Sequence, residues 1–310
     1  WLGNQENCSF HTSNRVIDLN RCSSGWELAI KNLKTGVIRK QTSKFVFIGA
    51  GGGSILLLQK AGVPEIQGYG GFPIGGQWLV CDNQEIVKQH DAKVYGLSPG
   101  AAPTMAVPHL DSRWLEGRKT LLFGPYAAWT TKFLHRGGSF FDLPGSIKHH
   151  NLLTLIKVGM SNIPLVSYLV QQGTQSMKTR LKELRNFYPK AKSKDWKLID
   201  AGIRVQAIKK EDGDAGIVHF GTEVVTTKDK TISALLGASP GASVCVSIVL
   251  EVAHKCMPQR INSEKSKKML QEMIPTYGLD LKRISSNDEI ESYKAVSTKA
   301  INDLLISGDN

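Results

Sequence analysis

The sequence lacks the short motifs by which several large classes of protein are recognised. Its five cysteines form no Cys-x-x-Cys pair and are odd in number, so we expect reduced thiols in a cytosolic protein. The adjacent His149 and His150 have no partners at the spacing of metal ligands, which predicts no metal site. No serine stands in a nucleophile elbow followed by an acid and a histidine, so serine-hydrolase chemistry is not expected.

Long hydrophobic runs are also scarce. The most apolar segment extends from Leu152 to Val170, but Lys157 and Pro164 interrupt it, and both are unfavourable in a membrane span. We expect two helices broken at Pro164, either buried in the core or lying at a membrane interface. The chain does not begin with Met and shows no signal-peptide pattern, which favours a fragment of a longer protein.

Positive charge exceeds negative charge, with 39 Lys and Arg against 27 Asp and Glu and a net charge of +12. Such a balance fits a basic binding module without catalysis, but no zinc-finger or aromatic RNA-binding signature is present, so we expect no nucleic acid. The densest basic segment is either a solvated helix face or a contact for an anionic membrane surface. Its basic residues are Lys178, Arg180, Lys182, Arg185, Lys190, Lys192, Lys194 and Lys197.

Glycine, with 30 residues, is abundant and clustered. The segment from Phe45 to Ser54 predicts a buried strand, a turn of small residues (Gly49, Ala50, Gly51, Gly52) and a helix that ends near Gly62. Such a turn lets a nucleotide or flavin approach the backbone. However, Ser54 stands where the dinucleotide fingerprint has its third glycine. The turn is therefore a Rossmann site, a packing turn, or a secondary contact to a cofactor whose main phosphate loop lies elsewhere.

A second glycine turn extends from Leu235 to Ser243. Ser239 suits a helix N-cap and Pro240 the first helical position, while Gly237 and Gly241 allow close approach to the backbone. We expect a buried helix from Val244 to His254 after this turn. Two interpretations are open: the N-terminus of this helix faces a ligand, or the turn only caps the helix.

The other elements indicate an α/β (α+β) fold. Alternating residues from Val16 to Ile38 predict a β-meander, and further strands are expected near Val107, at Leu121–Phe123 and in the last third of the chain. The glycine-rich segment 68–76 predicts a loop. Helices are expected at 177–187 and 195–201, and polar helices after Ser263.

The segment from Val107 to Arg113 carries the strongest candidate for catalysis. On a strand, His109, Asp111 and Arg113 share one face, so a base, a carboxylate that could orient it and a carboxylate-binding cation would lie together. The alternative is a polar strand face with an internal salt bridge. On a second expected strand, Arg204 and Gln206 also point the same way.

Together, these segments resemble FAD oxidoreductases of the amino-acid-oxidase and 2-hydroxyglutarate-dehydrogenase type, and most closely the malate:quinone oxidoreductase family. The resemblance covers nearly the whole chain and weakens after Leu281. The segments that carry it are Phe47–Gly53, Gly68–Trp78, Pro108–Arg113, Phe123–Pro125, Arg204–Gln206, Ser239–Ser243 and Met273–Gly278.

The resemblance implies part of a Rossmann-like FAD-binding domain with a β-meander, joined to a substrate domain with a mixed or antiparallel sheet and helices. Residues 1–67 would belong to the FAD-binding domain and 68–215 to the substrate-binding domain. Residues 216–310 would return to the FAD-binding domain and form the C-terminal helices. The family's N-terminal FAD phosphate loop has no counterpart in this sequence, so we do not expect the chain alone to bind FAD tightly.

The resemblance also implies a reaction: oxidation of (S)-malate to oxaloacetate in the tricarboxylic acid cycle, with electrons passing through FAD to a membrane quinone. The enzyme would be cytoplasmic and peripheral on the inner face of the bacterial cell membrane. Another FAD-dependent 2-hydroxy-acid or amino-acid oxidase is the alternative.

The roles that follow are a base at His109 with Asp111 as its orienter, a set of substrate-binding residues and a set of cofactor-binding residues. The substrate-binding residues are Arg113, Arg204, Lys132, Tyr126 and Gln206. The cofactor-binding residues are Gly49, Ala50, Gly51, Gly52, Gly237, Ser239, Pro240, Gly241, Ala242 and Ser243.

Overall fold

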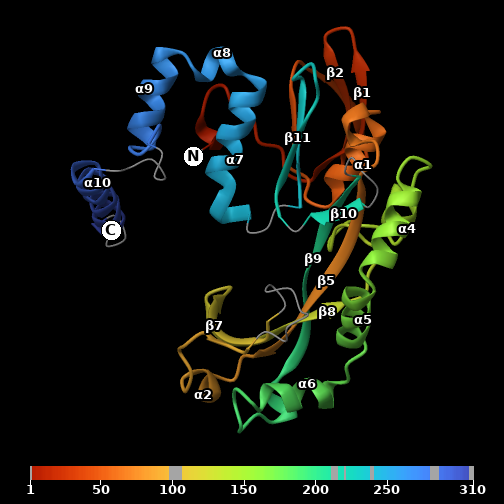
Figure 1. Ribbon diagram of the computed structural model, residues 1–310, viewed down its shortest axis with the longest axis vertical. Helices are drawn as coiled ribbons and strands as arrows, with labels where there is room; N and C mark the ends of the chain where they lie inside the picture. The colour runs from red at the N-terminus through yellow and green to blue at the C-terminus, as the bar shows by residue number, and fades with distance from the viewer. Residues whose placement is uncertain are drawn as a thin grey trace. The chain divides into compact units, whose positions relative to one another are not determined.

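The computed structural model describes residues 2–97, 107–210, 216–219, 221–237, 241–279 and 286–306 (Figure 1). The chain divides into two compact units, Trp1–Cys245 and Val246–Asn310. The first unit contains three sheets and the helices that cover them, and the second is helical. The expected mixture of helices with mixed and antiparallel sheets is confirmed.

The N-terminal sheet is the predicted β-meander. Strands β1 (Asn14–Cys22), β2 (Gly25–Asn32) and β3 (Ile38–Ser43) pair antiparallel in that order. Trp26 and Leu19 are buried on the inner face, and the Trp26 indole donates to Thr231 Oγ1 at 3.0 Å. This sheet is therefore attached to a segment more than 200 residues further along the chain.

A small mixed sheet follows. Strand β4 (Val46–Ile48) pairs parallel with β12 (Ile232–Leu236), which pairs antiparallel with β11 (Glu223–Thr226). The predicted strand, glycine turn and helix are confirmed, since β4 leads through 49–52 into α1 (Gly53–Lys60), although only Ile48 of the strand is buried.

The largest sheet has six antiparallel strands in the order β10-β9-β5-β8-β7-β6. These strands are β5 (Gly70–Cys81), β6 (Val94–Tyr95), β7 (His109–Leu115), β8 (Arg118–Ala128), β9 (Lys197–Lys210) and β10 (Gly216–His219). Figure 1 shows β5 and β9 side by side as long strands at the centre of this sheet.

The predicted loop at 68–76 is wrong, because the segment from Gly70 onward is the first half of β5. Pro73 pairs with Val205 of β9, whereas the pairing of β5 with β8 begins only at Gly75. A proline is tolerated in a strand where one side lacks a partner. The glycines fit because neighbours crowd them: a Cβ on Gly71 would lie 2.8 Å from the Val205 side chain.

The predicted helix at 195–201 is also wrong. A short 3₁₀ turn at Ser193–Asp195 is followed by β9, whose Ile199 pairs with Trp78 of β5. Pairing along the whole of β5 outweighs the local preference of these few residues.

The expected helix pair broken at Pro164 is confirmed. Helix α4 (Leu152–Ser161) ends at Asn162, and α5 (Ile163–Gly173) begins with Pro164 in its first turn, where proline is well tolerated. Helix α6 (Met177–Leu184) follows, capped by Ser176 Oγ, which accepts from the Thr179 N–H at 3.2 Å. Helices α2 (Gln84–Val87) and α3 (Asp142–Ser146) are short.

In the described part of the chain, no single helix is long and apolar enough to cross a membrane. Segments 152–161 and 166–173 pass that test only as a pair, with a bend of 79° between them.

The second unit contains most of α7 (Gly241–Cys256), with α8 (Pro258–Ile261), α9 (Glu264–Met273) and α10 (Asn287–Ile306). The predicted helix at Val244–His254 exists, but only one face of it is buried. Ile248 and Val252 are buried, whereas Val246 and Val249 are more than half exposed.

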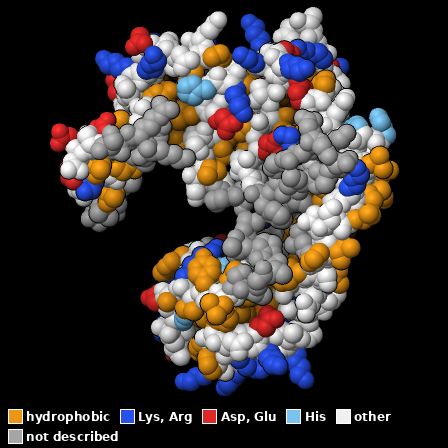
Figure 2. Space-filling view, in the orientation of Figure 1, with side chains coloured by type: hydrophobic (Ala, Val, Ile, Leu, Met, Phe, Trp, Pro, Cys, Tyr) orange, Lys and Arg blue, Asp and Glu red, His pale blue; other side chains and the backbone are white. Residues whose placement is uncertain are grey.

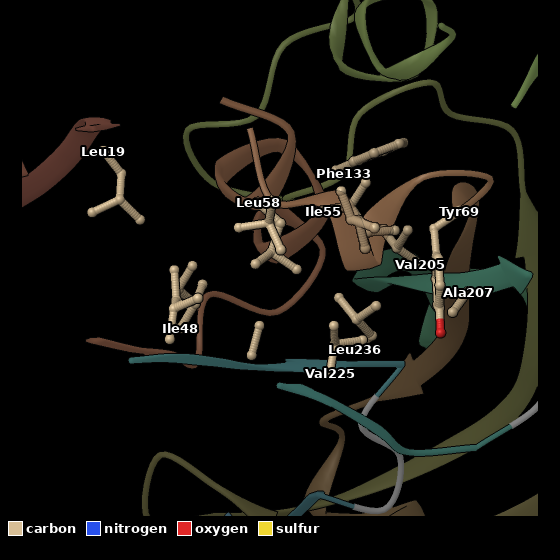
Figure 3. Close-up of a cluster of buried hydrophobic side chains, with 14 of the residues drawn as sticks. Leu19, Ile48, Ile55, Leu58, Tyr69, Phe133, Val205, Ala207, Val225 and Leu236 are labelled. Atoms are coloured by element: carbon tan, nitrogen blue, oxygen red, sulfur yellow. The ribbon is translucent and has the colours of Figure 1, made fainter. Parts of the chain in front are cut away.

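The main core of the first unit lies between α1, the mixed sheet and one face of β9 (Figure 3). Ile55 and Leu58 of α1 pack with Ile48 of β4, Leu236 of β12 and Val205 of β9. A second core lies between the six-stranded sheet and α6. It includes Leu79, Leu110, Phe123, Leu184 and Trp196.

We predict that Gly52→Ala destabilises the protein by ~1–3 kcal/mol, because overpacking forces the surrounding backbone to move. A Cβ at Gly52 would lie 2.2 Å from the Phe133 carbonyl oxygen and 2.5 Å from the Val205 side chain. Gly53→Ala is the matched control, since its Cβ would meet no atom closer than 3.5 Å. Urea unfolding of both variants tests this, and equal midpoints would contradict the packing argument.

Candidate functional site

A cavity of about 480 Å³ lies against one face of the six-stranded sheet. Five of the seven side chains expected to act on a substrate line it together: His109, Arg113, Tyr126, Arg204 and Gln206. They come from β7, β8 and β9, so the cavity depends on the pairing of strands that are distant in sequence.

The expected face of β7 is present, and it carries the internal salt bridge of the alternative interpretation rather than a contact between Asp111 and His109. Asp111 is buried and accepts from Arg113 Nε at 2.5 Å, and Lys93 Nζ lies 3.5 Å from the same carboxylate oxygen. The nitrogen Nδ1 of His109 lies 3.0 Å from the Val107 carbonyl oxygen. That carbonyl therefore orients the imidazole, while Asp111 holds two cations in place.

His109 sits among aromatic rings. The Trp78 ring packs edge-on against the imidazole with centroids 5.0 Å apart, and the Tyr95 ring lies 4.7 Å away. Burial is the main cause of a lowered pKa for His109, and the charges of Lys93 and Arg113 act in the same direction. The Val107 carbonyl and Asp111 partly oppose this shift. The imidazole is therefore neutral at neutral pH and can accept a proton.

Strand β9 supplies the other polar part of the lining. Arg204 and Gln206 project from the same face into the cavity, while Val205 and Ala207 between and after them pack into the core. Gln206 is 3% exposed, and its Oε1 accepts no hydrogen bond from the described residues. A buried oxygen without a donor favours a ligand that carries one.

Tyr126 forms a wall of the cavity. Its hydroxyl donates to the Arg180 carbonyl at 3.3 Å, and the Arg180 guanidinium lies 4.9 Å from its ring centre. Burial is the main cause of the raised pKa of this phenol, with Glu183 acting in the same direction. Lys132 does not line the cavity, because its ammonium lies over the Phe140 ring at 4.3 Å.

The sequence analysis missed several lining residues, among them Trp78, Lys93 and Tyr95. Trp78 shares a face of β5 with Ile74 and Gly76. The sequence analysis expected a loop at 68–76 and therefore did not apply the alternation of side chains along a strand to this segment. Lys93 and Tyr95 are two residues apart around the short strand β6, which only its pairing with β7 defines. Within the described ranges, no group of three His, Cys, Asp or Glu residues is placed to hold a metal.

The two glycine turns lie at the same edge of the mixed sheet. Strands β4 and β12 are parallel neighbours, so the turns at 49–52 and at Gly237 both follow the carboxyl ends of strands, the usual position for ligands in parallel sheets. Gly51 and Gly237 have positive φ, +55° and +60°, which favours glycine. Gly241, Ala242 and Ser243 begin α7, and Ser239 and Pro240 lie outside the described residues.

Some residues of the first turn are explained by packing alone. Gly52 is forced by its contact with Phe133 and Val205. Ser54, which replaces the third glycine of the fingerprint, is fully buried, and its Oγ accepts from the Ala50 N–H at 3.2 Å. Gly49 and Gly51 remain the positions in this turn where a ligand could approach the backbone.

A cavity with two arginines, a lysine and a neutral histidine has groups that suit a small organic anion and one group that can accept a proton. Comparison with known proteins identifies the family of this chain. The malate:quinone oxidoreductase family matches residues 1–303, and the chain belongs to that family.

Several bacterial relatives carry the name probable malate:quinone oxidoreductase. The chain is 49% identical to one from Flavobacterium psychrophilum, over 91% of this chain and 57% of the relative. It is 51% identical to one from Geobacillus kaustophilus, over 89% and 55% respectively. The chain thus spans little more than half the length of these relatives.

Among solved structures, a glycerol-3-phosphate dehydrogenase from Bacillus halodurans complexed with FAD overlaps 78% of this chain and 38% of its own. The TM-score is 0.44 and the identity 12%.

We predict that Asp111→Asn lowers the pKa of His109 further, because it removes the one nearby carboxylate that favours the imidazolium and leaves Lys93 and Arg113 opposing it. NMR titration of the His109 ring protons measures this. Asp91→Asn, which alters an exposed carboxylate bonded to Lys119, is the charge control. A His109 pKa that is unchanged or raised in Asp111→Asn would contradict the electrostatic account.

Proposed function

We propose that the whole protein to which this chain belongs oxidises malate to oxaloacetate and passes the electrons through FAD to a membrane quinone, a step of the tricarboxylic acid cycle. One observation carries the proposal: the cavity gathers a neutral histidine and two arginines around a buried glutamine. Malate has two carboxylates and one hydroxyl, which match these groups in number and kind.

The glycine turns fit a flavin nucleotide, because both follow the carboxyl ends of two parallel strands, the usual position for ligands in such sheets. Gly49, Gly51 and Gly237 would hold FAD, with the first turn of α7 supplying a positive helix end. FAD held there would supply the acceptor for the hydride from C2 of malate. We also propose that cofactor-binding and substrate-binding segments alternate along the chain. Residues 1–67 and 216–310 would belong to the FAD-binding domain, and residues 68–215 to the substrate-binding domain.

The side chains of the cavity then have separate roles. His109 accepts the proton of the malate hydroxyl at Nε2, since the Val107 carbonyl occupies the Nδ1 side. Arg113 and Arg204 bind the two carboxylates. Asp111 is a positioning residue, because its bond to Nε fixes the direction of the Arg113 guanidinium. Gln206 completes the polar lining beside Arg204, and the Tyr126 and Trp78 rings exclude water.

We predict that His109→Ala in the whole enzyme lowers kcat by ~100-fold or more, the usual effect of losing a general base. In the unaltered enzyme, kcat/KM should fall as the pH drops through a value below 6.5, the ordinary histidine pKa, because burial lowers the pKa of His109 and the base form persists to more acid pH. Quinone-dependent malate oxidation across pH measures both. Normal turnover by His109→Ala would remove this residue from the mechanism, and hydrogen peroxide formation without quinone would favour an oxidase.

We predict that Arg113→Ala and Arg204→Ala each weaken malate binding by ~1.5–3 kcal/mol, the worth of a charge-assisted hydrogen bond. KM for malate should rise by about 10- to 150-fold. Lys132→Ala is the matched control, because this lysine lies outside the cavity lining. Equal KM values for the arginine variants and the control would exclude these carboxylate clamps.

A peripheral membrane location is also part of the proposal. Leu153, Ile156 and Met160 of α4 and Ile163 of α5 are 49–70% exposed. Figure 2 shows hydrophobic side chains over α4 and α5, and Lys and Arg side chains over α6. Apolar insertion and attraction to anionic lipid would thus come from consecutive helices. Arg180 takes no part, because α6 buries it with Leu181 and Leu184.

We predict that replacing Lys178, Lys182 and Arg185 by Gln weakens binding to anionic liposomes by up to ~100-fold, since each well-placed cation contributes ~1 kcal/mol. Co-sedimentation at increasing salt measures the loss. The matched control replaces Lys31, Lys34 and Lys44, which are exposed in the N-terminal part of the chain. Equal losses in both triple variants would indicate net charge rather than a local membrane contact.

A further inference from the structure

Lys93 lines the cavity but has no part in the reaction as proposed. It directly precedes β6, in which Tyr95 pairs with His109 and Val94 with Leu110, so the same register brings Lys93 beside Asp111 of β7. Its ammonium lies 3.5 Å from the Asp111 carboxylate, and its side chain is 41% exposed. The lysine therefore reaches the cavity from the strand next to the one that carries His109.

Lys93 and Arg113 share one carboxylate. Arg113 Nε lies 2.5 Å and Lys93 Nζ 3.5 Å from the same oxygen of Asp111. One carboxylate neutralises only one of the two cations, and like charges this close repel each other. A surplus positive charge therefore remains between Lys93 and Arg113, and an anion bound there would be stabilised.

This surplus charge lies beside the imidazole of His109. The Lys93 ammonium is 5.3 Å from the centre of the Tyr95 ring, and the Arg113 guanidinium is 5.7 Å from the centre of the Trp78 ring. These two rings are the ones that pack against the imidazole. A base must lie within hydrogen-bond reach of the hydroxyl whose proton it takes. The two cations are therefore placed to bind a group next to that hydroxyl.

Arg204 enters the cavity from another part of the sheet. In the strand order β10-β9-β5-β8-β7-β6, three strand spacings separate β9, which carries Arg204, from β7. Neighbouring strands are just under 5 Å apart, so the backbones of β9 and β7 are separated by ~14 Å. Arg204 is thus placed to bind a group further from His109 than the group between Lys93 and Arg113.

We infer that malate binds with the carboxylate next to its hydroxyl-bearing carbon between Lys93 and Arg113, and with its other carboxylate at Arg204. Lys93 is then a further substrate-binding residue. The inference rests on the proposed function, because it takes malate as the substrate. Two cations at the reacting end also stabilise the negative charge that develops on the hydroxyl oxygen as its proton leaves.

The test uses the full-length, flavin-loaded enzyme and two acids that each lack one carboxylate of malate. 2-Hydroxybutyrate keeps the carboxylate next to the hydroxyl-bearing carbon, and 3-hydroxybutyrate keeps the other one. Both are measured as competitive inhibitors of malate oxidation. We expect Lys93→Gln to raise Ki for 2-hydroxybutyrate by ~5-fold, the effect of losing one half-exposed ion pair, and to leave Ki for 3-hydroxybutyrate unchanged. Arg204→Ala should have the opposite selectivity.

Lys93→Arg keeps the positive charge and should restore most of the binding of 2-hydroxybutyrate. Lys119→Gln is the matched control, because Lys119 of β8 also bonds to a carboxylate, that of Asp91, but does not line the cavity. A readout independent of turnover is the pKa of His109, measured by NMR. 2-Hydroxybutyrate should raise this pKa more than 3-hydroxybutyrate does, since a carboxylate close to an imidazole favours its charged form.

Three outcomes would overturn the inference: equal changes of the two Ki values in Lys93→Gln, a larger change for 3-hydroxybutyrate, or failure of 2-hydroxybutyrate to compete with malate. Failure of malate to reduce the flavin in the unaltered enzyme would instead overturn the proposed function.

Discussion

The pairing of β5 with β9 is the constraint on which the rest of the first unit depends. It extends from Gly70 opposite Ile208 to Val80 opposite Lys197. One face of β9 buries Val205 and Ala207 in the main core, and the other presents Arg204 and Gln206 to the cavity. Because side chains alternate along a strand, a slip of one residue would exchange the two sets. The same register therefore fixes both the core and the position of the polar side chains that line the cavity.

The cavity is held in shape by a small electrostatic network. Asp111 is a buried carboxylate beside two cations and near an imidazole whose pKa burial lowers. A buried charge without a partner would be strongly unfavourable, so Asp111 and Arg113 depend on each other. The network keeps the Arg113 guanidinium at the cavity without adding a hydrogen bond to His109. The backbone carbonyl of Val107 orients the imidazole instead.

The abundant glycines serve two different purposes. Gly51 adopts positive φ at the end of a parallel strand and has open space around it, which fits a ligand-contacting turn, whereas Gly237 combines positive φ with a close approach of the Gly221 carbonyl. Gly52 and Gly71 are required because Val205 and Phe133 leave no room for a side chain. In the sequence these two kinds of glycine look alike. A glycine cluster therefore indicated a loop at 68–76, where the structure has a tightly packed strand from Gly70 onward.

The sequence by itself determined the β-meander, the strand–turn–helix at 45–60, the helix break at Pro164 and the shared face of His109, Asp111 and Arg113. Each of these follows from side-chain periodicity or from the local conformational limits of glycine and proline, which act over a few residues. Only the tertiary structure decided that 70–76 and 197–201 belong to strands, that Lys93, Tyr95 and Trp78 join the cavity, and that Asp111 faces cations rather than His109. Those outcomes depend on contacts between segments tens to more than a hundred residues apart. The free energy of these contacts exceeds the small free-energy differences behind the local preferences that a sequence pattern reports.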